Sequence, residues 1–91
     1  MLKLRLSKQA SRSLNELPAK HARQIAEKIS KLSEDELGVP SIELRGFAPW
    51  RRLKSGEYRV VYRIAEGELF IGLIGKRNDD EIYRLVAQFL R

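Results

Sequence analysis

The middle of this 91-residue chain concentrates positively charged side chains. Residues 45–63 carry a net excess of five positive charges, which is most of the +6 of the whole chain. The cations are Arg45, Arg51, Arg52, Lys54, Arg59 and Arg63, and the one acid among them is Glu57. Such a concentrated positive field favours a polyanion such as RNA or DNA, or an acidic protein, as the binding partner.

Strand parity indicates where these cations point. In the stretch SGEYRVVYRI every second residue from Tyr58 onward is apolar, so Arg59 and Arg63 share the opposite face with Val61. Arg52 and Lys54 are two residues apart on the preceding strand and can join them. Because the helices need the apolar face, we expect an exposed cationic sheet surface. An ordinary solvated sheet face would mix in acids, since like charges repel across a hairpin, so we favour a functional use.

A second basic stretch, IGKRNDDEIY, follows the last predicted strand. Lys76 and Arg77 come where that strand ends, after Gly75 has loosened the backbone. Tyr83 lies six residues beyond Arg77, in the first turns of a predicted helix. It is either a core aromatic residue or a residue that stacks on a base or handles a proton, because tyrosine has both a π-face and a hydroxyl group.

The residue types exclude several kinds of site. Cysteine is absent, so the chain has no disulfide and no thiolate nucleophile. The single histidine, His21, is predicted on the outer side of a helix as a surface residue. The acids at 34–36 and 79–81 are explained as helix ends, and no cluster has the pattern of a metal site. We therefore expect neither a metal nor a cofactor.

The N-terminal part of the chain is predicted to form a strand and two helices. Residues 2–7 alternate leucine with cations, which indicates a strand with one buried face. Ser7 can cap a helix over residues 8–17, and Pro18 can open a second helix. The apolar stripe of this second helix is predicted to consist of Ala22, Ile25, Ala26, Ile29 and Leu32. Residues 33–46 are expected to form a loop.

The rest of the chain is predicted to form three strands and a closing helix. The strands, at 50–54, 57–65 and 68–76, are joined by the turn signals SG and EG and should be antiparallel. Parity places Leu69, Ile71 and Leu73 on one apolar face. Residues 78–91 have helical periodicity, with Asn78 or Asp79 as the cap. The order β-αα-βββ-α predicts a small single α+β domain, residues 1–91, with an antiparallel sheet packed against helices.

Nothing in the sequence indicates a membrane or an export route. No apolar run approaches the ~20 residues of a membrane span. The N-terminus lacks the apolar block of a signal peptide. A cytoplasmic protein is expected.

The segments LRGF, WRRLKSGEYRVVYRI and GLIGKRNDDEIY together resemble the RelE/ParE superfamily of bacterial toxin–antitoxin toxins. The nearer match is the RelE branch, which cleaves mRNA on the ribosome. The resemblance follows the order of elements along nearly the whole chain and is strongest from residue 44 to residue 83. It implies a RelE-like fold and, as partners, a cognate antitoxin with an acidic or amphipathic helix, the ribosome and mRNA.

The resemblance also implies which residues line an active site. The arginine of the YR pair is Arg59, the arginine of KR is Arg77, and the tyrosine six residues beyond is Tyr83. A basic pair on the preceding strand is matched best by Arg52 and Lys54, where RelE-type toxins often carry two lysines. The arginine of LRG, Arg45, matches a residue near the RNA.

The implied reaction is metal-independent cleavage with the 2′-OH of the RNA as nucleophile. Lys54 or Tyr83 would act as base, Arg59 would hold the scissile phosphate and Arg77 would stabilise charge. The other cations expected to contact RNA are Arg45, Arg51, Arg52, Arg63 and Lys76. Two alternatives stay open at this stage: a ParE-like toxin that inhibits DNA gyrase, and a non-catalytic nucleic-acid-binding module.

Overall fold

The computed structural model describes residues 1–76 and 78–89, which form five strands and three helices in the predicted α+β class. The elements are β1 (Lys3–Leu6), α1 (Lys8–Glu16), α2 (Ala19–Glu34), β2 (Ile42–Glu43), β3 (Arg51–Ser55), β4 (Tyr58–Ala65), β5 (Glu68–Gly75) and α3 (Asp79–Phe89). The predicted elements are confirmed to within a few residues. The short strand β2 lies within the segment that was predicted to be a loop.

The five strands form one mixed sheet in the order β1-β5-β4-β3-β2. Strands β3, β4 and β5 are antiparallel as predicted, and both tight turns use backbone with positive φ, at Gly56, Glu66 and Gly67. Strand β1, in contrast, pairs with β5 in parallel. The prediction of a wholly antiparallel sheet was therefore wrong at this edge. The two helices that follow β1 form the first part of the long connection to β5 that a parallel arrangement requires.

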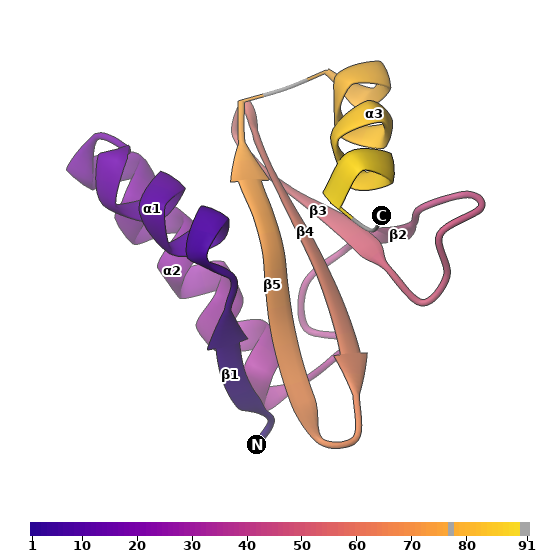
Figure 1. Ribbon diagram of the computed structural model, residues 1–91. Coiled ribbons are helices and arrows are strands. Elements are labelled where there is room, and N and C mark those ends of the chain that lie inside the picture. Colours follow the sequence, from indigo (N-terminus) through magenta and orange to yellow (C-terminus); the bar gives the residue numbers. More distant parts are fainter. Residues whose placement is uncertain (77, 90–91) are drawn as a thin grey trace.

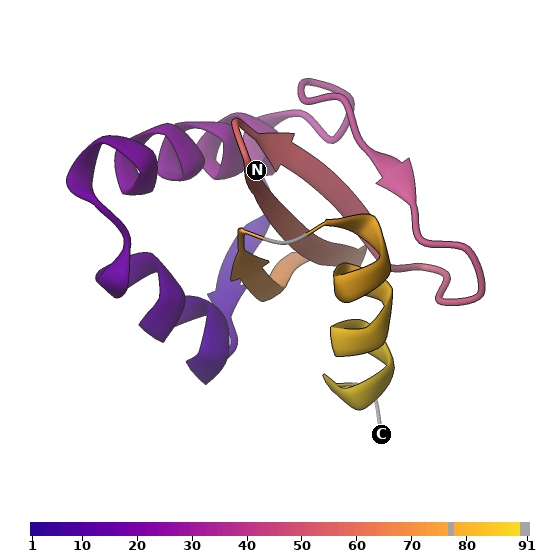
Figure 2. The ribbon, with the colours of Figure 1, turned by 90° about the horizontal axis from the view of Figure 1, so that it is seen from above.

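Helices cover both faces of the sheet. Figure 2 shows α1 and α2 on one side and α3 on the other, and Figure 1 shows the same division seen across the strands. The face under α3 carries a second core, in which Val61 and Leu73 pack with Ile82 and Val86. The prediction that only one face is apolar was wrong, because Val61, expected on the exposed face, is buried.

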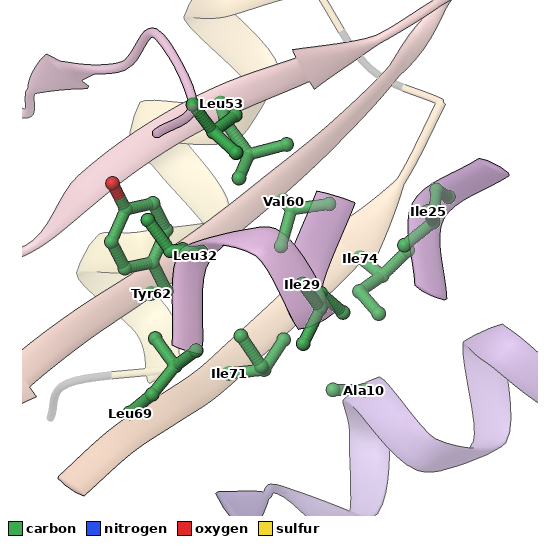
Figure 3. Packing of buried hydrophobic residues seen from close by; sticks show 11 residues of the cluster. Ala10, Ile25, Ile29, Leu32, Leu53, Val60, Tyr62, Leu69, Ile71 and Ile74 are labelled. Atoms are coloured by element: carbon green, nitrogen blue, oxygen red, sulfur yellow. The ribbon is translucent and has the colours of Figure 1, made fainter. Parts of the chain in front are cut away.

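The larger core lies between the sheet and the first two helices. Figure 3 shows Ile25, Ile29 and Leu32 of α2 directed at the side chains of the central strands. This part of the predicted helix stripe is confirmed, whereas Ala26 is exposed. The predicted caps are also confirmed: Ser7 Oγ accepts the N–H of Ala10 at 3.0 Å, and Asn78 Oδ1 accepts the N–H of Glu81 at 2.9 Å.

An irregularity in β5 changes the side on which its side chains lie. Val61 is opposite Leu73, but the next residue, Tyr62, is opposite Ile71, so Gly72 is an extra residue in β5. Leu69 and Ile71 consequently face α1 and α2, while Leu73 faces α3. The predicted common face for these three residues was wrong, because simple alternation does not continue through a bulge.

Candidate active-site surface

Two cations lie directly opposite each other on the central hairpin. Lys54 of β3 is the register partner of Arg59 of β4, so both side chains lie on the sheet face that carries α3. Lys54 is exposed and Arg59 is half-buried. The Nη1 atom of Arg59 donates to the carbonyl oxygen of Tyr58 at 3.3 Å and to that of Gly56 at 3.5 Å. The guanidinium is therefore held close to the hairpin turn beside the lysine.

Arg52 lies on the same sheet face as Lys54 and Arg59, but it is buried. Its register partners are Val61 on β4 and Ile42 on β2, and only 8% of its surface is exposed. The parity prediction that Arg52 shares a face with Lys54 is confirmed. The prediction that this face is exposed at Arg52 was wrong, because neighbouring Val61 belongs to the core that α3 covers.

Tyr83 connects α3 to the turn that carries Arg45. Its hydroxyl oxygen accepts the backbone N–H of Arg45 at 2.9 Å, and its half-buried ring lies 6.1 Å from the ring of Phe47. The side chain of Arg45 is exposed, next to Gly46, whose φ is +82°. Tyr83 thus has a structural role, and its hydroxyl still carries a proton to donate. Arg77, the remaining predicted catalytic residue, lies outside the described residues.

Two of the predicted RNA contacts lie away from Lys54 and Arg59. Arg51 donates two hydrogen bonds to Ser41, from Nε to the hydroxyl oxygen at 2.9 Å and from Nη2 to the carbonyl oxygen at 3.1 Å. The hydroxyl of Tyr62 donates a third hydrogen bond to the hydroxyl oxygen of Ser41 at 2.8 Å. Arg51 is opposite Tyr62, so it belongs to the other sheet face. Arg63 lies near the far end of β4, with its guanidinium 5.4 Å from the ring centroid of Trp50.

Lys76 forms an exposed ion pair with Glu57, at 2.9 Å between Nζ and Oε2. The hydrogen bond and the charge of Lys76 lower the pKa of the Glu57 carboxyl below its ordinary value, and Glu57 raises the pKa of Lys76 above its own. Glu57 lies in the β3–β4 turn, and Lys76 directly follows β5. Glu57 therefore neutralises one predicted RNA contact.

The ion pair predicts a small pH dependence of stability. Because its pKa is lowered on folding, Glu57 stabilises the protein above the ordinary glutamate pKa of about 4.3, and this contribution is lost as the pH falls through the lower folded value. We expect Glu57→Gln to lower the melting temperature slightly at pH 7, and this difference from the wild type should vanish at acidic pH. Melting curves from pH 2 to pH 7 check this. A difference that grows on acidification would contradict the assignment.

His21 does not lie on the outer surface of α2. Its ring is half-buried, and its centroid is 5.1 Å from that of Tyr58. The prediction was wrong because His21 lies four residues before Ile25 and so extends the inward-facing stripe of the helix. It belongs to the face opposite Lys54 and Arg59, since Tyr58 packs against the larger core.

Sequence reasoning missed the aromatic residues that hold some of the cations. Trp50 and Phe70 both lie within cation–π distance of Arg63, and Phe70 also lies under Arg5. The alternation of Phe70 with the buried Leu69 and Ile71 was available as a signal. Their proximity to Arg63 and Arg5 depends on pairing across strands, which a single strand pattern does not contain.

Within residues 1–76 and 78–89, no group of three or more His, Cys, Asp or Glu side chains could hold a metal ion. In the same part of the chain, none of the helices combines the length and apolarity needed to cross a membrane.

Comparison with solved structures finds close matches in fold. The isolated E. coli RelE toxin has 20% sequence identity, a TM-score of 0.75 and full coverage of both chains. The RelBE2 toxin–antitoxin complex of Mycobacterium tuberculosis has 26% identity and a TM-score of 0.70, over 84% of this chain and 98% of the other. The YoeB dimer of Staphylococcus aureus has 16% identity and a TM-score of 0.70, over 85% and 98%.

Comparison of the sequence identifies a family. No curated protein sequence matches the chain. The family described as the ParE toxin of the parDE type II toxin–antitoxin system matches residues 4–81, which is most of the chain. The protein is therefore a member of the ParE toxin family within the RelE/ParE superfamily, a toxin of a type II toxin–antitoxin system with the same fold as RelE.

Proposed function

We propose that this toxin is a ribosome-dependent endoribonuclease that cuts mRNA without a metal ion. The observation that carries the proposal is the pair Lys54 and Arg59, two cations in register on adjacent strands of one sheet face. Like charges in this arrangement destabilise a sheet. A phosphodiester bound over Lys54 and Arg59 would offset this repulsion, because its negative charge attracts both cations.

The proposed reaction uses the 2′-OH of the RNA as nucleophile. Its oxygen attacks the adjacent phosphorus, the bond from phosphorus to the 5′-oxygen breaks, and the products are a 2′,3′-cyclic phosphate and a free 5′-hydroxyl. Lys54 takes the proton of the 2′-OH, Arg59 holds the phosphate and the charge that develops on it, and the leaving 5′-oxygen takes a proton from solvent water. Arg77 is proposed to stabilise charge on the leaving oxygen, on the resemblance of its motif alone.

Tyr83 is the alternative base, and its hydrogen bond argues for a positioning role. Because its oxygen already accepts the N–H of Arg45, it is less available to accept a proton from the substrate. Tyr83 instead holds the turn that presents the exposed Arg45 to RNA. Arg52 adds positive charge to the sheet face that carries Lys54 and Arg59.

We expect Tyr83→Phe to lower the cleavage rate by no more than about tenfold, because the ring stays and only the bond to Arg45 is lost. Removing a general base would cost roughly 10²–10⁴-fold, and this is the result expected for Lys54→Met. Single-turnover cleavage on programmed ribosomes compares the two variants. If Tyr83→Phe is the more damaging change, Tyr83 is the base and Lys54 is not.

The family match favours a second candidate function, inhibition of DNA gyrase. The family that matches the sequence is that of ParE toxins, and the resemblance noted from the sequence associates ParE with inhibition of DNA gyrase. DNA breaks that depend on gyrase, in cells with intact messages, would favour this function over RNA cleavage.

An antitoxin partner is also proposed. Similar solved structures include RelB–RelE complexes from Methanococcus jannaschii and Pyrococcus horikoshii. The positive charge of residues 45–63 fits an acidic helix of a partner, and an amphipathic helix could compete with α3 for the core that its apolar stripe covers. Co-expression with the neighbouring open reading frame tests this. A protein that purifies alone and leaves its host growing normally would count against a toxin–antitoxin pair.

The experiment for the proposed function is expression in cells followed by primer extension on a translated message. We expect growth arrest and discrete stops inside the reading frame. Blocking translation initiation should remove the stops. Stops that persist under this block would exclude dependence on the ribosome.

A further inference from the structure

Four side chains form an alternating row of cations and aromatic rings across the sheet. The guanidinium carbon of Arg5 lies 5.6 Å from the ring centroid of Phe70. The guanidinium carbon of Arg63 lies 5.5 Å from the same ring and 5.4 Å from the ring of Trp50. The row Arg5–Phe70–Arg63–Trp50 therefore links β1, β5 and β4 to the residue that precedes β3.

Strand register places this row on the face of the sheet that carries α3. Phe70 is the register partner of Arg5 on one side and of Arg63 on the other. Phe70 packs against the core under α3, and Trp50 contacts Phe89 near the end of that helix, with the ring centroids 5.8 Å apart. The row thus lies beside the C-terminal end of α3. Lys54 and Arg59 lie at the other end of the same sheet face.

The cations of the row are accessible and held in place. The side chain of Arg5 is 62% exposed, and Arg63 is exposed. Glu68 pairs with Arg5 at 3.1 Å and offsets one positive charge, while Lys3, two residues before Arg5 on β1, adds an exposed cation to the same face. A guanidinium on an aromatic ring keeps its N–H groups in the plane of the group, where they can make bidentate contacts to phosphate.

We propose that the Arg5–Phe70–Arg63–Trp50 row binds the phosphate backbone of ribosomal RNA. Clustered, exposed cations on one face are the electrostatic footprint of a surface that binds a nucleic-acid backbone. The row faces the same way as Lys54 and Arg59, so an RNA assembly that presents a message to those residues also faces the row. Helix α3 lies between the two, so the row contacts a different stretch of RNA from the message. The identity of this RNA rests on the proposed function.

The double variant Arg5→Gln/Arg63→Gln tests the row. The probe is purified ribosomes carrying a short message with a 2′-deoxy nucleotide at the cut site, so that binding is measured without cleavage. We expect at least about tenfold weaker binding and a salt slope smaller by about 1–2, as for the loss of two phosphate contacts. The control is Arg12→Gln, which removes one positive charge from an exposed position of α1, outside the row. It should bind ribosomes as tightly as the wild type does.

A second variant separates charge from geometry. Arg63→Lys keeps the charge but loses the planar group that rests on two rings, so we expect weaker binding with a nearly unchanged salt slope. The proposal is overturned if Arg5→Gln/Arg63→Gln binds ribosomes like Arg12→Gln, or if it loses affinity only for the antitoxin. Wild-type protein that binds ribosomes but cuts no message contradicts the proposed cleavage alone. Wild-type protein that binds no ribosomes contradicts both proposals.

Discussion

Replacing Arg59 with alanine is expected to lower the single-turnover rate of mRNA cleavage on programmed ribosomes by at least about 100-fold. Such a loss is typical when one preorganised group that stabilises transition-state charge is removed. Arg59 is the cation best placed for this role, because it is half-buried and fixed at the hairpin turn, while its neighbour Lys54 is exposed. Arg59→Lys should recover only part of the rate, since it restores the charge without the bidentate fork.

The same substitution should change the fold little. The bonds from Arg59 to the carbonyl oxygens of Gly56 and Tyr58 are long, at 3.5 and 3.3 Å, and the substitution also relieves the repulsion from Lys54. We expect the free energy of unfolding to change by less than about 1 kcal/mol. Arg23→Ala, at an exposed position of α2, is the matched control and should affect neither property. If Arg59→Ala unfolds readily or cuts at the wild-type rate, the cation is structural.

Replacing Gly72 with alanine is expected to destabilise the protein by about 1–3 kcal/mol, the usual cost of overpacking a core. A Cβ atom at this position would lie 2.8 Å from Cζ3 of Trp50 and 3.1 Å from Cε2 of Phe89. The contact with Trp50 is shorter than Cβ atoms show in proteins, and the contact with Phe89 is tight enough that its ring must shift slightly. Since a change of 1 kcal/mol shifts the melting temperature of a domain this size by roughly 4–8 °C, thermal melting measures the effect directly.

The reason for the cost can be tested with a second substitution. Phe89→Leu should make room beside residue 72, so the effects of Gly72→Ala and Phe89→Leu should be less than additive. Because Phe89 ends α3 and Tyr83 lies within it, Gly72→Ala should also loosen the contact of Tyr83 with Arg45. Additive effects on the melting temperature would show that the added methyl group does not press on α3.

Local patterns were sufficient to predict most of the fold. The capping residues Ser7 and Asn78 and the turns at Gly56 and Gly67 act over a few residues, so the sequence contains their full signal. The bulge at Gly72 was not predictable in this way, because it depends on how Trp50 and Phe89 pack over β5. The parallel pairing of β1 depends likewise on the path of two helices through space.

The candidate site was predictable to the extent that it lies on one hairpin. The register of Lys54 with Arg59 follows from a two-strand pattern and the turn between the strands. The burial of Arg52 and the hydrogen bond that the N–H of Arg45 donates to the Tyr83 hydroxyl depend on contacts between segments that are distant along the chain. The separation of Arg51 from Arg52 and Lys54 follows from strand alternation, whereas its hydrogen bonds with Ser41 join residues ten positions apart and could not be predicted from one strand.

The most direct test of RNA cleavage is to mix the purified protein with ribosomes that carry a defined message, in buffer containing EDTA at a concentration that leaves the ribosomes intact. We expect cuts at discrete positions of the bound message, with a cyclic phosphate on the upstream product, and no cuts in the same message without ribosomes. An uncut message on ribosomes, together with inhibition of purified DNA gyrase by the same protein, would contradict ribosome-dependent cleavage.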